Sequence, residues 1–187
     1  MPSKPLTPLQ YAILGLIHMQ PSTGYAIRKI FAESPMGNYS ASQGAIYPAL
    51  AKLVDAGLIN PASTGLKRAH ETRIYQITTT GQQMLMDWLR QPLSIEDMVR
   101  NPDLFMLRFA FLSVLEDTVE TIQQLKSFAQ AMKQGLEEIA AYLAADNDLS
   151  QHASLALQHG ATVYRARAQW ARAAITSFET TLGEPRK

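Results

Sequence analysis

The spacing of apolar residues predicts helices at the start of the chain. Apolar residues recur at helical spacing after Thr7-Pro8 and stop before Pro21. Threonine accepts the free backbone donors of a helix start, and proline is tolerated at the first helical position. A turn at 22–24 precedes a second short helix, and a third helix, with Ser40 or Ser42 as its cap, continues to Gly57.

Pro48 interrupts the pattern of the third helix, whose apolar positions are Ile46, Leu50, Leu53 and Val54. Proline in a helix interior loses a hydrogen bond and costs about 3 kcal/mol. The third helix therefore either begins late or bends at Pro48.

After Gly57 the pattern changes to two short strands. One includes Leu58 and Ile59, and in the other Ile74 and Ile77 alternate around Tyr75. The polar segment between them carries the basic pair Lys67-Arg68. A further helix is expected from Thr78 or Thr79 to before Pro92. Three helices followed by a two-stranded hairpin with a basic tip is the order of a winged helix, which places its third helix in the major groove of DNA.

The second half of the chain predicts longer helices. Asn101-Pro102 starts a segment that is apolar nearly all round to Leu112, so we expect a buried helix there. Two later runs, after Asp117 and from Leu157 to Leu182, alternate apolar steps of three and four, the heptad pattern of paired helices. The first would extend about 40 Å. We expect a mainly α protein in which long antiparallel helices also form a homodimer.

Charge differs between the two halves of the chain. The 187 residues carry a formal net charge of +1, but residues 1–90 have eight basic and four acidic side chains, and the remainder has nine and twelve. A basic first half favours a polyanion as its partner. We therefore predict a winged-helix DNA-binding domain over 1–92 and a helical dimerisation domain over 93–187, which is also the candidate effector-sensing domain.

Several other classes are disfavoured by composition and spacing. The chain has no cysteine, and no apolar run is long enough to span a bilayer, so we expect a cytoplasmic protein without a membrane partner. His152 and His159 lack a second ligand at helical spacing, and a loop from Asp146 has Leu157 where calcium requires glutamate. We expect no metal, no cofactor and no catalytic residues, since no nucleophile motif or phosphate loop occurs.

Several motifs together resemble the PadR family of bacterial transcriptional regulators over roughly residues 6–90. They are the segment 42–50 (SQGAIYPAL) with Leu53 and 57–59, the segment 73–78 (RIYQIT) with Gly81, and the early segments 14–16 and 23–25. The tail is similar to the helical C-terminal region of longer PadR members, a branch with phenolic-acid-responsive repressors and a virulence-gene activator. The resemblance implies a dimeric DNA-binding regulator and makes Pro48 expected. The wing at 65–71 lacks the proline that the family pattern carries there.

Two sets of candidate site residues follow. For DNA contact we favour Ser40, Ser42, Gln43 and Tyr47 at the start of the third helix, and Lys67 and Arg68 on phosphate at the wing. The alternative is that the serines are only caps, that Tyr47 packs on the core and that the wing charges are merely solvated. Arg28, Lys29 and Lys52 are further candidates.

A small aromatic effector is expected to bind a cavity lined by aromatic residues, with Arg108 or Tyr164 as a polar anchor. The rings are those of Trp88, Phe105, Phe109 and Trp170, which on the alternative interpretation simply form core. The predicted function is a homodimeric, sequence-specific transcriptional regulator on a pseudo-palindromic operator in double-stranded DNA, acting as a ligand-responsive repressor. The alternative is a winged-helix module that binds protein and not DNA.

Overall fold

The first helix, α1 (Pro8–Met19), begins where the sequence predicts it in the computed structural model, which describes residues 5–34, 43–62, 73–145 and 148–183. The Thr7 hydroxyl accepts a hydrogen bond from the Gln10 backbone N–H, and the Thr7 backbone N–H donates to Gln10 Oε1 at 2.9 Å. This reciprocal capping box satisfies backbone donors that the helix leaves free. The buried face of α1 contributes Ala12, Ile13, Leu14 and Ile17 to the core.

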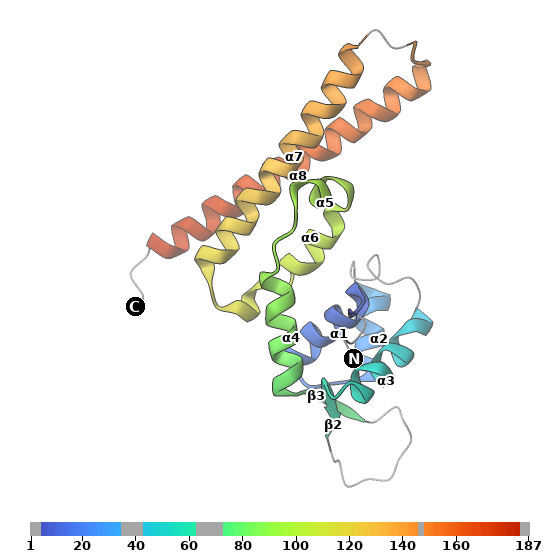
Figure 1. Ribbon diagram of the computed structural model, residues 1–187, viewed down its shortest axis with the longest axis vertical. Helices are drawn as coiled ribbons and strands as arrows, with labels where there is room; N and C mark the ends of the chain where they lie inside the picture. Colours follow the sequence, from blue (N-terminus) through green and yellow to red (C-terminus); the bar gives the residue numbers. More distant parts are fainter. Residues whose placement is uncertain (1–4, 35–42, 63–72, 146–147, 184–187) are drawn as a thin grey trace. The chain divides into compact units, whose positions relative to one another are not determined.

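The chain divides into two compact units. Unit 1 comprises residues 1–91 and 110–115, and unit 2 comprises 92–109 and 116–187. Figure 1 shows the order of the elements along the chain. The short segment 110–115 thus groups with unit 1, although the sequence analysis assigned it to the second domain.

The turn predicted at 22–24 contains a short strand. β1 (Ser22–Thr23) pairs antiparallel with β3 (Ile74–Ile77), and Thr23 also caps α2 (Gly24–Glu33) by accepting from the Ala26 N–H at 3.1 Å. β3 pairs on its other side with β2 (Ile59–Pro61), so the sheet order is β1-β3-β2. The strand β1 was missed because two residues show no alternation and depend on a partner far along the chain.

The third helix begins late, as one of the two readings of Pro48 required. A 3-10 helix, η2 (Gln43–Ala45), leads into α3 (Ile46–Asp55), so Pro48 lies in the first turn, where a backbone donor has no helical acceptor to lose. Ala45 precedes α3 and makes no side-chain cap. The predicted caps Ser40 and Ser42 lie outside the described residues. Gly57, with φ of 69°, ends the helix as predicted.

The rest of unit 1 packs against α1. Thr78 caps α4 (Thr79–Arg90) by accepting from the Gly81 N–H at 3.0 Å.

The apolar segment from Leu104 is not one helix, because α6 (Pro102–Phe109) ends at Phe109 and a 3-10 helix, η4 (Leu112–Leu115), follows. Phe111 lies in unit 1 with its ring against Gly15, where an added Cβ would come within 2.5 Å of the ring.

Unit 2 is built on a long helical hairpin. α7 (Thr118–Ala144) and α8 (Gln151–Gly183) run side by side, as the heptad pattern predicted (Figure 1). A short helix that was not predicted from the sequence, α5 (Ile95–Arg100), packs against α7 and α6. The shared core there is almost fully buried and includes Met98, Phe105, Leu125, Phe128 and Met132. The fold is thus mainly α, a winged-helix arrangement followed by long antiparallel helices.

Candidate functional site

The start of α3 carries the part of the predicted DNA contact that the structure describes. Gln43 begins η2, and Tyr47 lies in the first turn of α3 with 39% of its surface exposed. One edge of the Tyr47 ring packs on Gly24, where an added Cβ would lie 2.9 Å from the ring carbon Cε1. Tyr47 therefore packs against α2 and is still partly exposed. Its position is compatible both with packing and with the predicted DNA contact.

The wing is described only at its base. β2 and β3 pair in register, with Ile59 opposite Ile77 and Pro61 opposite Tyr75. Thr78 fastens this base to the end of α3, since its hydroxyl donates to the Gly57 carbonyl at 2.8 Å. The predicted phosphate contacts Lys67 and Arg68, like Ser40 and Ser42, lie outside the described residues. Their roles stay predictions.

The outer face of α2 holds an aromatic and cationic pair to which the sequence analysis gave no joint role. The guanidinium carbon of Arg28 lies 5.5 Å from the centre of the Tyr25 ring, and Tyr25 is 52% exposed. The two residues are three apart on a helix, which is the sequence signal that predicts such a contact. Nearby, Lys29 forms an ion pair with Glu33 at 3.8 Å.

The structure divides the predicted effector residues between the two units. Trp88 lies in unit 1, where its ring stacks on Tyr11 with centroids 4.3 Å apart. Phe105, Phe109 and Trp170 lie in unit 2 and pack into one aromatic cluster with Phe128 and Phe178. These rings fill the space between α6, α7 and α8, which favours the core interpretation for them.

The two predicted polar anchors both lie in unit 2. Arg108 is on α6 and is 4% exposed. Tyr164 is on α8, and its hydroxyl donates to the Val99 carbonyl at 3.0 Å. The phenol group of Tyr164 therefore already has a hydrogen-bond partner within the protein, and this bond joins α8 to α5.

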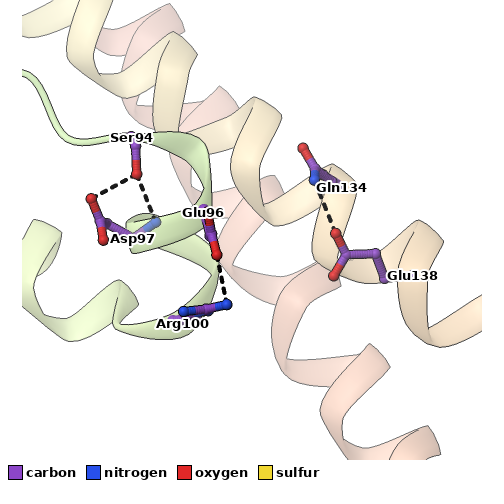
Figure 2. A network of polar contacts seen from close by, with 6 residues as sticks. All are labelled: Ser94, Glu96, Asp97, Arg100, Gln134 and Glu138. Atoms are coloured by element: carbon purple, nitrogen blue, oxygen red, sulfur yellow. Dashed lines mark hydrogen bonds and ion pairs between the residues drawn. The ribbon is translucent and has the colours of Figure 1, made fainter.

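A polar pocket of about 290 Å³ opens between α5 and α7. Figure 2 shows the side chains around it, with Glu96 paired to Arg100 on α5 and Gln134 donating to Glu138 at 2.9 Å on α7. Val99 completes its lining. The charged groups of the pocket already bind neighbours on their own helices and remain largely exposed, so they are strongly hydrated.

The described ranges hold neither a metal-binding group nor a membrane-spanning helix. Within residues 5–34, 43–62, 73–145 and 148–183, no group of three or more histidine or acidic side chains is arranged to hold a metal ion. His152 and His159 are both exposed on α8. None of the helices in these same ranges combines the length and apolarity that crossing a membrane requires.

The N-terminal part of the chain is similar to known transcriptional regulators. Residues 13–87 match the model of the transcriptional regulator PadR-like family. The negative transcriptional regulator PadR of Bacillus subtilis (strain 168) is 39% identical over 107 residues, which cover 57% of this chain and 58% of that relative. The matched segment therefore spans less than two thirds of the relative's length.

Two solved structures of Bacillus subtilis PadR are also similar. One is the complex with operator DNA, at 27% identity over 93% of this chain and 99% of that chain, with a TM-score of 0.45. The other is the complex with p-coumaric acid, at 27% identity over 92% and 99%, with a TM-score of 0.42.

The matched residues coincide with the elements that the motifs singled out. They run from within α1 through α2, α3 and the sheet into α4. The match confirms the resemblance of this region, and residues 13–87 of the chain form a domain of the PadR-like family of transcriptional regulators.

Proposed function

We propose that the protein is a sequence-specific DNA-binding transcriptional regulator that acts as a homodimer in the cytoplasm and represses its target genes. The observation that carries the proposal is the exposed Tyr47 in the first turn of α3, held on Gly24 within the PadR-like domain. In winged-helix proteins the helix at this place in the fold enters the major groove, and residues near its N-terminus contact base edges. No catalytic step belongs to this function.

The domain roles follow from the same proposal. The winged-helix region, 1–92, would bind DNA, and the helical region, 93–187, would dimerise. In a dimer the two α3 helices would enter successive major grooves of a pseudo-palindromic site, about 34 Å apart. Ser40, Ser42, Gln43 and Tyr47 would contact the groove, and Lys67 and Arg68 would contact phosphate.

The hairpin supports the dimer part of this proposal. The seam of α7 and α8 is fully buried near Leu125 and Phe128, but beyond Gly135 it is only partly buried at Leu136, Ile139, Leu143 and Leu157. Tyr142 and Leu155, near the ends of the two helices, are 52% and 55% exposed. A second copy of the hairpin would cover these apolar side chains.

The experiment that tests DNA binding uses labelled duplex DNA from upstream of the protein's own gene. Fluorescence anisotropy should show binding that weakens steeply between low and moderate salt, because displaced counterions oppose it at high salt. A random duplex of equal length should bind more weakly. Absence of salt-sensitive binding to either duplex, together with stable capture of a protein partner, would favour the interaction module instead.

Ligand response is proposed for small aromatic acids, because the Bacillus subtilis relative has been crystallised with p-coumaric acid. The chain has two tryptophans, and Trp88 and Trp170 lie in different units. The Trp88→Phe variant leaves Trp170 as the reporter of the aromatic cluster. Titration with p-coumaric acid should change its emission and weaken DNA binding, and unchanged emission and affinity would contradict this part.

A further inference from the structure

The exposed face of α2 presents a guanidinium that is already oriented. Arg28 lies over the face of Tyr25, 5.5 Å from the ring centre, and Tyr25 is 52% exposed. A cation over an aromatic face is attracted by the ring and loses rotational freedom before any ligand arrives. The flat guanidinium still has N–H groups along its edge, in the fork geometry that matches a phosphate.

The neighbouring cation of α2 differs from Arg28 in its surroundings. Lys29 Nζ lies 3.8 Å from Glu33 Oε2, so its charge is partly neutralised on its own helix. In the described part of the chain, no acidic side chain forms an ion pair with Arg28. The two adjacent residues thus carry the same charge, but among the described residues only Lys29 has a carboxylate partner.

Helical spacing places Arg28 beside the start of α3. Gly24 and Arg28 are four apart and lie on neighbouring turns of one face of α2, and Gly24 is where the Tyr47 ring packs. The Tyr25 ring, which the Arg28 guanidinium contacts, directly follows Gly24 in the chain. Arg28 and Tyr25 therefore both lie within one helical turn of the residue of α2 on which the start of α3 packs.

We propose that Arg28 binds a backbone phosphate of the DNA at the edge of the groove that α3 enters, with Tyr25 as the residue that positions it. The inference rests on the proposed function, and it adds a described contact on α2 to those expected at α3 and the wing. Because a phosphate is common to every sequence, this contact contributes to affinity and register and not to base preference.

The test compares two variants that remove the same charge one residue apart. Arg28→Gln and Lys29→Gln are measured with two labelled duplexes of about 30 base pairs, one from upstream of the gene and one of random sequence. Arg28→Gln should weaken binding on the order of tenfold to both duplexes and lower the slope of log affinity against log salt by about one. Lys29→Gln should weaken binding less than Arg28→Gln does, because Lys29 is paired with Glu33 on its own helix.

Variants of Tyr25 test the positioning role. Tyr25→Phe keeps the ring and should bind DNA like the wild type, whereas Tyr25→Leu should weaken binding in the same direction as Arg28→Gln. Arg28→Lys, which keeps the charge but loses the fork, should fall between Arg28→Gln and the wild type. Far-UV circular dichroism and thermal unfolding establish that each variant is folded.

The outcomes separate this inference from the proposed function. If the wild type binds both duplexes with salt dependence but Arg28→Gln and Lys29→Gln weaken binding equally, the phosphate contact at Arg28 is overturned and DNA binding stands. If Tyr25→Leu binds like the wild type, the positioning role is overturned. If the wild type binds neither duplex, the proposed function fails and the inference fails with it.

Discussion

The ring of Tyr164 lies on the bare backbone of Gly135, and the hydroxyl of the same tyrosine donates to the Val99 carbonyl at 3.0 Å. An added Cβ at position 135 would lie 2.7 Å from the ring carbon Cε1. The ring is held by its hydroxyl at one end and by α8 at the other, so it has little freedom to withdraw. One tyrosine thus joins α5, α7 and α8 at a single point.

The first prediction concerns this contact. Gly135→Ala should lower the free energy of unfolding of unit 2 by up to about 2 kcal/mol, because an overpacking cost of about 1–3 kcal/mol against the Tyr164 ring outweighs the roughly 1 kcal/mol that alanine gains over glycine in a helix. Urea unfolding followed by circular dichroism measures the effect.

Gly160→Ala is the matched control on the same hairpin. Its Cβ would lie 3.2 Å from Ile139 Cδ1, the flexible end of a side chain. Alanine is favoured over glycine in a helix by about 1 kcal/mol, so this variant should be as stable as the wild type or more so. Equal losses in both glycine variants would show that general helix crowding, and not the Tyr164 ring, sets the cost.

The second prediction concerns Gly15 and Phe111 in unit 1. Gly15→Ala should be destabilising, since its Cβ would lie 2.5 Å from the Phe111 ring. Because Phe111→Leu makes room for that methyl group, the double variant should be more stable than the sum of the single losses predicts, by about 1 kcal/mol or more. Chemical unfolding of all four proteins gives the coupling energy, and strict additivity would contradict the contact.

The third prediction separates packing from DNA contact at Tyr47. Tyr47→Phe keeps the ring that packs on Gly24 and removes only the hydroxyl of this 39% exposed side chain. Thermal stability should be unchanged, while affinity for the upstream duplex should fall by about 1 kcal/mol, roughly fivefold. A loss of stability with unchanged DNA affinity would leave Tyr47 with a packing role alone.

The fourth prediction concerns self-association through the hairpin. Tyr142→Gln and Leu155→Gln should each weaken the homodimer in sedimentation equilibrium by about 2 kcal/mol or more, because a two-fold interface loses the apolar side chain twice. Met19→Gln removes a 63% exposed apolar side chain from unit 1 and should leave association unchanged. Unchanged association in both hairpin variants would place the interface elsewhere.

Helix boundaries could be predicted where the signal is local. Thr7 with Gln10, the left-handed Gly57 and the Asp117 cap of α7 each lie within a few residues of the bond they make. Elements that depend on distant partners were missed. The strand β1 exists because β3 pairs with it, and α6 ends at Phe109 because that ring packs in unit 2 while Phe111 packs in unit 1. The short helix α5 did have a signal, the Ser94 cap with Asp97 three residues later.

The candidate site was predictable to the same degree. The position of Tyr47 follows from Pro48, which fixes where α3 can begin. Which aromatic rings meet does not follow from the sequence, because periodicity shows that a ring is buried but not against what. Trp88 stacks on Tyr11 and Trp170 meets Phe109, contacts that span more than sixty residues of chain.

The return of residues 110–115 to unit 1 means that the backbone passes from one unit to the other at three places, after Gln91, Phe109 and Leu115. A fragment excised at residue 92 would therefore lack Phe111 and leave Gly15 without the ring that packs on it. The winged-helix unit is consequently not a single continuous segment of the chain. Any hybrid regulator made by exchanging N-terminal halves must also carry residues 110–115 with them.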